Sequence, residues 1–189
     1  MSVFDNGNAV WFLMRGSGVV SLLLLTGVMA LGIATRGAVR LAAMPRFATL
    51  ALHRSMSLLS VVFIGVHVAS AVIDSYAQVR LVSVFVPFTA SHRALLVGLG
   101  AIAVDLTLAL IVTGLLRERI GRRTWRAIHW TAYATWPVAF IHAVGMGTDT
   151  SSLWLRVLGI ACVGLIGGAV AWRVLLPPDN TSSAMTARP

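Results

Sequence analysis

The sequence has few charged residues, no lysine and a single cysteine. Charged residues make up 11% of its 189 positions, whereas a soluble domain carries about 25%. This shortage excludes an ordinary soluble protein, and a 58% hydrophobic content with a mean hydropathy of +0.87 indicates an integral membrane protein. Cys162 has no second cysteine to pair with, so an internal disulfide is excluded and a small packing residue is expected.

Five apolar segments are long enough to cross a hydrocarbon core, which takes about 20 helical residues. They cover residues 17–35, 50–73, 94–116, 127–147 and 152–176. We therefore predict an all-α membrane protein, a bundle of five transmembrane helices. The first segment is kept as a helix and not a cleaved signal peptide, because no basic residue precedes Arg15. Residues 177–189 are polar and predict a disordered cytoplasmic tail.

The basic residues are all arginines and are concentrated in particular connections. Eleven of the fifteen lie around the connections after the first and third predicted helices or after the fifth: Arg36, Arg40, Arg46, Arg54, Arg117, Arg119, Arg122, Arg123, Arg126, Arg173 and Arg188. Because cytoplasmic loops carry the excess of arginine, we expect the N-terminus outside and the C-terminus in the cytoplasm. The net charge of +9 is thus explained by topology, and lipid, not nucleic acid, is the expected partner.

Four of the five histidines lie in two predicted helices that run in the same direction. His53 and His67 are fourteen residues apart, and His129 and His142 are thirteen apart. At 1.5 Å per residue these intervals are about 21 and 20 Å, so His53 lies level with His129 and His67 level with His142. Two facing imidazoles at each level are the arrangement that ligates a heme iron on both axial positions. We therefore predict two b-type hemes.

The angle between the two histidines around the helix axis supports this pairing in the second predicted helix but not in the fourth. Fourteen residues at 100° each end about 40° short of four turns, so His53 and His67 share a face. Thirteen residues end about 140° short, so a straight helix would turn His129 and His142 apart. Pro137 lies between them, and a kink or local rewinding there is expected to restore the facing.

Histidines in membrane helices can also have other roles. Any single one is more often a packing residue bonded to its neighbours, and the matched intervals are what favour heme. A zinc-type site is disfavoured because it needs three or four ligands close together. His92, at the outer start of the third helix, is expected to be an interface residue. Asp105, in the middle of that helix, must face the protein interior, where it is paired, protonated or coupled to proton movement.

Two further segments are read as structural. Residues 75–91 are too short to span and are broken by Pro87, so we expect a surface-lying or re-entrant piece that caps the outer end. The string Gly98-Leu-Gly100-Ala-Ile-Ala103 lies inside an apolar helix. Because a dinucleotide-binding fingerprint needs a preceding strand, we attribute these glycines to helix packing.

The sequence resembles the ferric reductase-like transmembrane domain superfamily, which includes ferric reductases, NADPH oxidases and the heme-binding subunit of the bacterial periplasmic methionine sulfoxide reductase system. The resemblance covers residues 10–175 approximately, and its most specific element is the paired spacing of the four histidines. The segments LHRSMSLLSVVFIGVHV and GRRTWRAIHWTAYATWPVAFIHAVGMGTD look like an actinobacterial branch. The resemblance implies His53 with His129 on an inner heme and His67 with His142 on an outer heme, within a heme-binding domain of residues 1–176.

The resemblance also implies partners. The chain contains no FAD or NAD(P)H domain of the kind that larger members carry, so a separate donor is expected, either membrane quinol or a cytoplasmic flavoprotein. A quinone is a candidate cofactor, and flavin enters only through a partner. The acceptor would be ferric iron, oxygen or an extracytoplasmic protein. A composition rich in Ala, Val, Leu and Arg favours a bacterial origin, and hence the bacterial cytoplasmic membrane, as a multi-pass protein.

Three residues near the proposed hemes are candidates for supporting roles. Arg54 and Arg126 lie beside the inner ligands and can pair with heme propionates, although positive-inside topology also accounts for them. Trp136 lies between the two heme levels, where it either fills the gap that an electron crosses or is ordinary aromatic core. Two other functions stay open: a heme-binding membrane anchor for an extracytoplasmic reductase such as methionine sulfoxide reductase, and a heme-free proton channel or transporter using the histidines and Asp105.

Overall fold

The computed structural model describes residues 6–36, 45–147 and 152–175. Its elements, in chain order, are α1 (Asn6–Arg36), α2 (Arg46–Ile73), α3 (Leu81–Phe85), α4 (Ala94–Leu115), α5 (Arg117–Ile120), α6 (Arg122–His129), α7 (Ala132–Met146) and α8 (Leu153–Leu175). Helices are the regular elements throughout these ranges, which agrees with the predicted all-α class. Arg40 and the predicted tail 177–189, which includes Arg188, lie outside the described residues.

Four helices have the length and composition needed to cross a membrane. These candidate spans are Ala9–Ala34, Phe47–Ile73, Ala94–Leu115 and Leu153–Leu175, and they coincide with four of the five predicted segments. The protein is therefore a multi-pass membrane protein. The remaining predicted segment, 127–147, is not one helix but is divided between α6 and α7. With 15 residues, α7 alone falls short of the roughly 20 that a spanning helix needs.

The division between α6 and α7 is a short stretch of tighter winding. The backbone N–H groups of Trp130, Thr131, Tyr133 and Ala134 each donate to the carbonyl three residues earlier, at 2.9–3.2 Å. Bonds of this spacing belong to a 3₁₀-helix, which has three residues per turn. The rewinding therefore lies at residues 130–134, one turn before Pro137, whose own place is inside α7. This position has a physical cause, since proline leaves the carbonyl of Tyr133 without its helical donor and crowds it.

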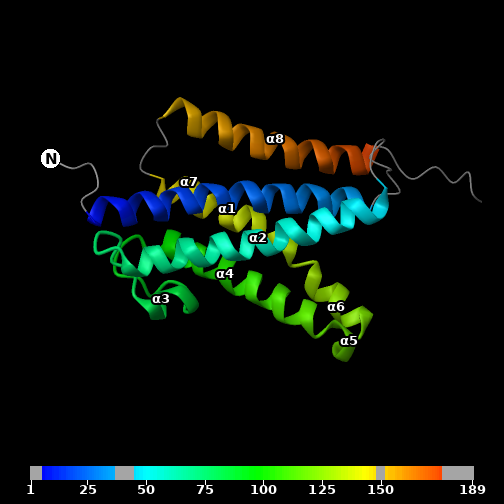
Figure 1. Cartoon of the computed structure of the whole chain (residues 1–189), viewed down its shortest axis with the longest axis horizontal. Coiled ribbons are helices and arrows are strands. Elements are labelled where there is room, and N and C mark those ends of the chain that lie inside the picture. The colour runs from blue at the N-terminus through cyan, green and yellow to red at the C-terminus, as the bar shows by residue number, and fades with distance from the viewer. Residues whose placement is uncertain (1–5, 37–44, 148–151, 176–189) are drawn as a thin grey trace, which may run out of the picture.

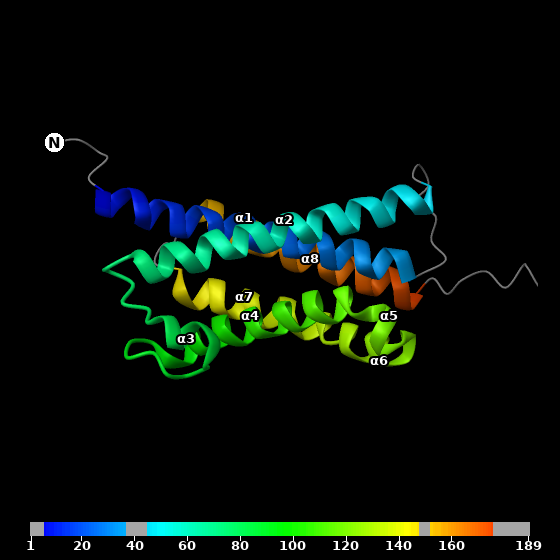
Figure 2. The same ribbon diagram turned by 60° about the horizontal axis from the view of Figure 1, so that its bottom comes forward.

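The long helices form an elongated bundle. Helix α1 packs against α2 along most of its length and also against α7 and α8, while α7 packs against α4. The start of α1 and α3 lie at one end of the bundle, and α5, α6 and the end of α8 lie at the other (Figure 1). The turned view separates α1 and α2 from α4 and α3, with α7 between them (Figure 2). Helices α2 and α7, which carry most of the predicted ligands, share at most marginal backbone contact within the described ranges.

Segment 75–91 turns back over the start of α4. Its short helix α3 packs on α4, and Phe88 lies so close to Gly98 that a Cβ there would overlap its ring. Ser83 is fully buried and its hydroxyl accepts a hydrogen bond from Thr89 at 3.2 Å. The prediction of a non-spanning piece at one end of the bundle agrees with this arrangement, and Gly98 is explained by packing.

A small core joins α1, α7 and α8. Trp136, Cys162 and Ile166 are buried there and pack with Leu25, Met29, Ala30 and Phe140. Cys162 is a free, buried packing residue, as expected. The Trp136 indole N–H donates to the Thr26 hydroxyl at 2.9 Å, and that hydroxyl donates to the Leu22 carbonyl at 2.7 Å. Both polar groups are thus paired inside an apolar layer, where an unpaired group would be costly.

The outer faces of the long helices are apolar. Leu58, Val62, Leu95, Ile160 and many similar side chains are exposed, which suits contact with lipid acyl chains instead of water. Hydroxyl groups within the spans bond to carbonyls of their own helix, as Ser21 does to Ser17 and Ser60 to Met56, both at 2.8 Å. Such bonds satisfy the hydroxyl without a water partner.

Candidate functional site

His67 of α2 lies against α1. Its Nδ1 donates to the Met14 carbonyl oxygen at 2.8 Å, and its ring lies over Gly18, where an added Cβ would be 3.0 Å from Nδ1 and Cε1. Glycine at this position therefore lets the ring approach the α1 backbone closely.

His53 repeats this arrangement four helical turns away. Its Nδ1 donates to the Val28 carbonyl oxygen of α1 at 3.1 Å, and its Cε1 would be 3.4 Å from a Cβ added at Gly32. Because α2 is continuous between the two histidines, they are about 21 Å apart along its axis. Both rings face α1, as their shared helix face predicts.

His142 of α7 is held by α4 in the same way. Its Nδ1 donates to the Leu96 carbonyl oxygen at 2.7 Å, and an added Cβ at Gly100 would be 2.7 Å from its Cε1. Gly100 belongs to the glycine pair attributed to helix packing. What it packs against is a predicted ligand.

These hydrogen bonds determine which ring nitrogen of each histidine carries the proton. A carbonyl oxygen can only accept, so Nδ1 of His53, His67 and His142 must be the donor. The neutral ring then has its lone pair on Nε2. A metal-binding histidine is normally held in this manner, with one nitrogen bonded to a carbonyl and the other free to ligate.

The structure brings His67 and His142 together. Their ring centroids are 6.3 Å apart and their planes are inclined at 77°. Two imidazoles bound to one metal ion through nitrogens at about 2 Å have centroids about 6 Å apart. The rings come from α2 and α7, whose backbones are not closely packed, so the side chains alone span the interval. This spacing would allow both rings to bind one metal ion from opposite sides.

His129 is placed differently from the other three. It is the last residue of α6 and stacks on Trp125 of the same helix, with centroids 4.9 Å apart and planes inclined at 22°. It is half-buried, as His53 is. The structure thus brings the rings of His67 and His142 into contact. His53 and His129, the other predicted pair, contact different parts of the protein.

Arg15, Arg54, Arg93 and Arg126 lie at the ends of the bundle. Arg54 and Arg126 are exposed, one turn or less from His53 and His129 in sequence. At the opposite end Arg15 lies over the Trp11 ring, 4.5 Å from its centroid. Arg93 donates to the Gly145 carbonyl at 3.0 Å, which places a cation at the carbonyl end of α7, where the helix dipole favours it.

The remaining singled-out residues take simpler positions. Trp136 is in the core between α1, α7 and α8 and stacks on Phe140 at 5.2 Å. His92 is exposed before α4, and Asp105 is half-buried in the middle of α4. Among the described residues, no three His, Cys, Asp or Glu side chains gather as a metal site.

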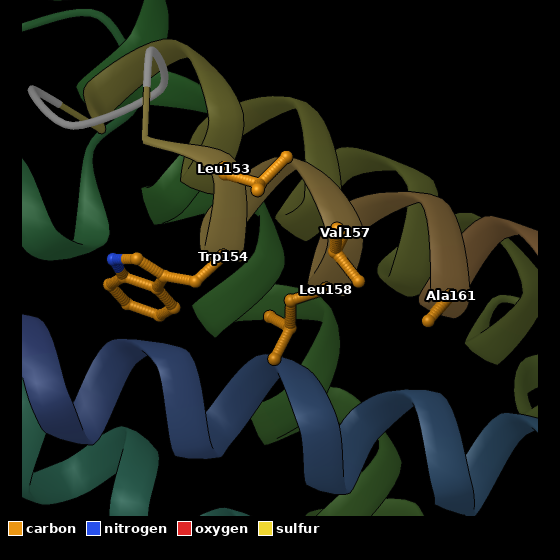
Figure 3. A pocket seen from close by; sticks show the side chains of 5 residues that line it. All are labelled: Leu153, Trp154, Val157, Leu158 and Ala161. Carbon is orange, nitrogen blue, oxygen red and sulfur yellow. The ribbon is translucent and has the colours of Figure 1, made fainter.

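An apolar groove lies beside α8. It is lined by Leu153, Trp154, Val157, Leu158 and Ala161, and Trp154 and Leu158 point from α8 toward α1 (Figure 3). These side chains supply no ionisable group and no metal ligand. The groove suits a lipid chain and has no part in the histidine site.

Sequence reasoning did not identify the backbone partners of the histidines. The acceptors are the carbonyls of Met14, Val28 and Leu96, and a carbonyl leaves no mark in a sequence. The glycines are visible in the sequence, because Gly18 and Gly32 are separated by the same fourteen residues as His53 and His67. This equal spacing is the signal in the sequence for both contacts.

Comparison with known proteins gives one match. The model of a family described as ferric reductase like transmembrane component matches residues 17–140, nearly two thirds of the chain. The matched part includes His53, His67 and His129 and ends two residues before His142. No curated protein and no solved structure was found to match.

Proposed function

The chain belongs to the ferric reductase-like transmembrane family, and on that premise we propose that it is a diheme b-type cytochrome that carries electrons across a membrane. The observation that supports this most directly is the facing pair of His67 and His142, with ring centroids 6.3 Å apart. Both rings have Nδ1 bonded to a carbonyl, which leaves Nε2 of each as the ligating atom.

The two histidine levels would each hold one heme. His67 and His142 would hold the heme iron at one level, and His53 and His129 would hold it at the other, about 21 Å away along α2. A bound heme iron alternates between ferric and ferrous states and so carries single electrons. The protein's part would be to hold the four rings and to fix the tautomers of His53, His67 and His142. Trp136 lies between the two levels only in the sequence of α7; its ring packs in the core with α1 and α8.

The chain would cross the membrane five times, with α6 and α7 together as the fourth crossing. The N-terminus would be outside and the C-terminus in the cytoplasm of a bacterial cell. The distribution of arginine supports this orientation, since Arg117, Arg119, Arg122 and Arg123 lie at the α5–α6 end. An impermeant maleimide applied to intact cells should label Ser75→Cys and leave Arg123→Cys unlabelled until the cells are opened.

The ends of the bundle would meet the redox partners. Arg54 and Arg126 are exposed at the α5–α6 end, where they can pair with propionates of the inner heme or with an anionic flavoprotein. Membrane quinol or a cytoplasmic flavoprotein would be the donor. The acceptor would be ferric iron, oxygen or an extracytoplasmic protein, reached from the outer pair.

Heme content tests this proposal. Detergent-purified protein should give about two hemes b per chain in a pyridine hemochrome assay, with His67→Ala and His129→Ala each removing one. His92→Ala is the matched control, because His92 is an exposed histidine outside the set and its loss should leave both hemes.

Heme content together with electron transfer to an added acceptor separates the alternatives. A protein without heme contradicts the proposal and leaves a proton channel or transporter, to be tested by ion flux. A protein that holds hemes but does not pass their electrons to any external acceptor is an anchor subunit instead of a conduit.

A further inference from the structure

Three histidines are held by one recurring arrangement. A glycine of the neighbouring helix lies under the ring, and the carbonyl four residues before that glycine accepts the Nδ1 proton. The sets are Gly18 and Met14 for His67, Gly32 and Val28 for His53, and Gly100 and Leu96 for His142. We call such a glycine, together with the carbonyl four residues before it, a histidine seat. Without a Cβ at the glycine, the ring lies in the helix groove and reaches the carbonyl.

The seats follow the antiparallel register of each helix pair. On α1 and α2, the glycines and the histidines share a spacing of fourteen residues, so one register serves both seats. On α4, the residue fourteen positions after Gly100 is Gly114. The carbonyl four residues before it belongs to Leu110. Helix α4 therefore repeats the pattern of α1 where the remaining histidine, His129, would be expected.

This fourth seat is open. Within the described part of the chain, nothing lies within 4 Å of a Cβ added at Gly114. His129 is close by in the fold, since α6 packs against α4, but its ring stacks on Trp125. An open helical position ordinarily favours alanine, which has the higher helix propensity. Packing among the described residues gives no reason for glycine here.

The tighter winding between α6 and α7 turns His129 toward the side of α4 on which Gly114 would hold it. His129 and His142 are one residue closer than Gly100 and Gly114, which corresponds to about 100° of missing rotation. A 3₁₀ residue turns about 120°, roughly 20° more than an α-helical one. The four i to i+3 bonds at residues 130–134 thus restore most of the missing rotation. His129 and His142 can then both face α4.

We propose that Gly114 and the Leu110 carbonyl form the seat that His129 occupies when the inner heme is bound, and that Gly18, Gly32, Gly100 and Gly114 are positioning residues for the four ligands. This inference rests on the proposed diheme function. Each seat would leave Nε2 available to bind the iron and, through the Nδ1 hydrogen bond, would give the ring more anionic character. Such a ring stabilises the ferric state.

Gly114→Ala is the decisive variant, because the described packing around Gly114 predicts no effect of an added methyl group. Its control is Gly16→Ala on α1, a helical glycine that also has nothing within 4 Å. The inner heme of Gly114→Ala should bind about 10- to 100-fold more weakly, the usual loss when a ligand's hydrogen-bonding partner is removed. If the site's preference for ferric over ferrous heme falls tenfold, the midpoint potential of that heme rises by about 59 mV.

The readouts are heme content, redox titration and the low-spin electron paramagnetic resonance signal of each heme. The outer heme reports folding in the same molecules and should be unchanged in Gly114→Ala. Gly100→Ala should give the reverse pattern, with a perturbed outer heme and an intact inner one, since its Cβ would meet His142.

Two results overturn the inference, and they are distinguishable. Wild-type protein with two hemes and a Gly114→Ala variant that matches Gly16→Ala in potential and resonance signal would refute the seat alone. Wild-type protein without heme would refute the proposed function, and the seat with it. Loss of only the inner heme, or a shift confined to it, is the expected outcome.

Discussion

At the scale of single residues, the site depends on hydrogen bonds between imidazole rings and the backbone of a neighbouring helix. The Nδ1 bonds of His53, His67 and His142 are 2.7–3.1 Å long. Each neutral ring is thereby held in one tautomer and one orientation before any ligand binds. Pre-organised ligands of this kind bind a metal cofactor more tightly and tolerate little displacement.

The Thr26–Trp136 hydrogen bond should stabilise the core that supports α7. Thr26→Val keeps the side-chain shape but leaves the buried indole N–H of Trp136 without its acceptor. We expect a loss of about 1–3 kcal/mol, the cost of a buried polar group left unpaired. Reversible unfolding in mixed detergent micelles measures it.

Thr113→Val is the control for this change. The Thr113 hydroxyl bonds to carbonyls of its own helix, with its shorter bond, 2.6 Å, to Ala109, so its removal orphans no donor on another helix. Equal losses for the two variants would show that the interhelical bond contributes nothing of its own.

At the residue level, the structure bears on the predicted positions of the histidines, and their role as ligands stays a prediction. The spacing of the histidines predicted that His67 would lie level with His142, and the two rings are in contact. The seats were missed because half of each is a backbone carbonyl. Trp136 could not be placed from sequence either, since its partners Thr26, Cys162 and Ile166 come from two other helices.

At the scale of elements, the junction between α6 and α7 decides how the two histidines of this segment relate. Hydrophobicity predicted the segment 127–147 as one helix, and four other segments were predicted to within a few residues except for the longer start of α1. A run of apolar residues says where a helix can lie but not how tightly it is wound. The 3₁₀ bonds at residues 130–134 were therefore not predictable beyond the expectation that Pro137 disturbs its neighbourhood.

Pro137→Ala should convert this junction toward a continuous α-helix. The new N–H can bond the Tyr133 carbonyl, and the steric conflict with that carbonyl disappears. His129 would then rotate away from the direction of His142 by up to about 80°, since each of the four 3₁₀ bonds adds about 20°. We expect loss of the inner heme with the outer one retained, measured by pyridine hemochrome and redox titration.

Pro87→Ala is the matched control for the junction variant. Pro87 lies in the loop after α3, away from α6 and α7 in the sequence, so its substitution should leave heme content at the wild-type level. A Pro137→Ala protein that keeps two hemes of unchanged potential would contradict the role given to the junction.

At the scale of the whole molecule, two helix pairs face each other across the histidines. One pair is α1 with α2, and the other is α4 with α7; in each, a glycine-bearing helix supports a histidine-bearing one. Helix α8 packs on the outer side of α1 and contributes to the core around Trp136. The histidine-bearing helices α2 and α7 therefore need not pack closely together. Their rings are oriented by hydrogen bonds to α1 and α4 instead.

The most direct test of the conduit is electron transfer through the protein in sealed vesicles. Purified protein is reconstituted with ferricyanide trapped inside, and dithionite is added outside. We predict that the trapped ferricyanide is bleached at a rate proportional to protein content, and that vesicles with His67→Ala or His129→Ala bleach it no faster than empty vesicles while His92→Ala behaves as wild type. Full reduction of both hemes without any bleaching of the trapped ferricyanide would contradict transfer across the membrane.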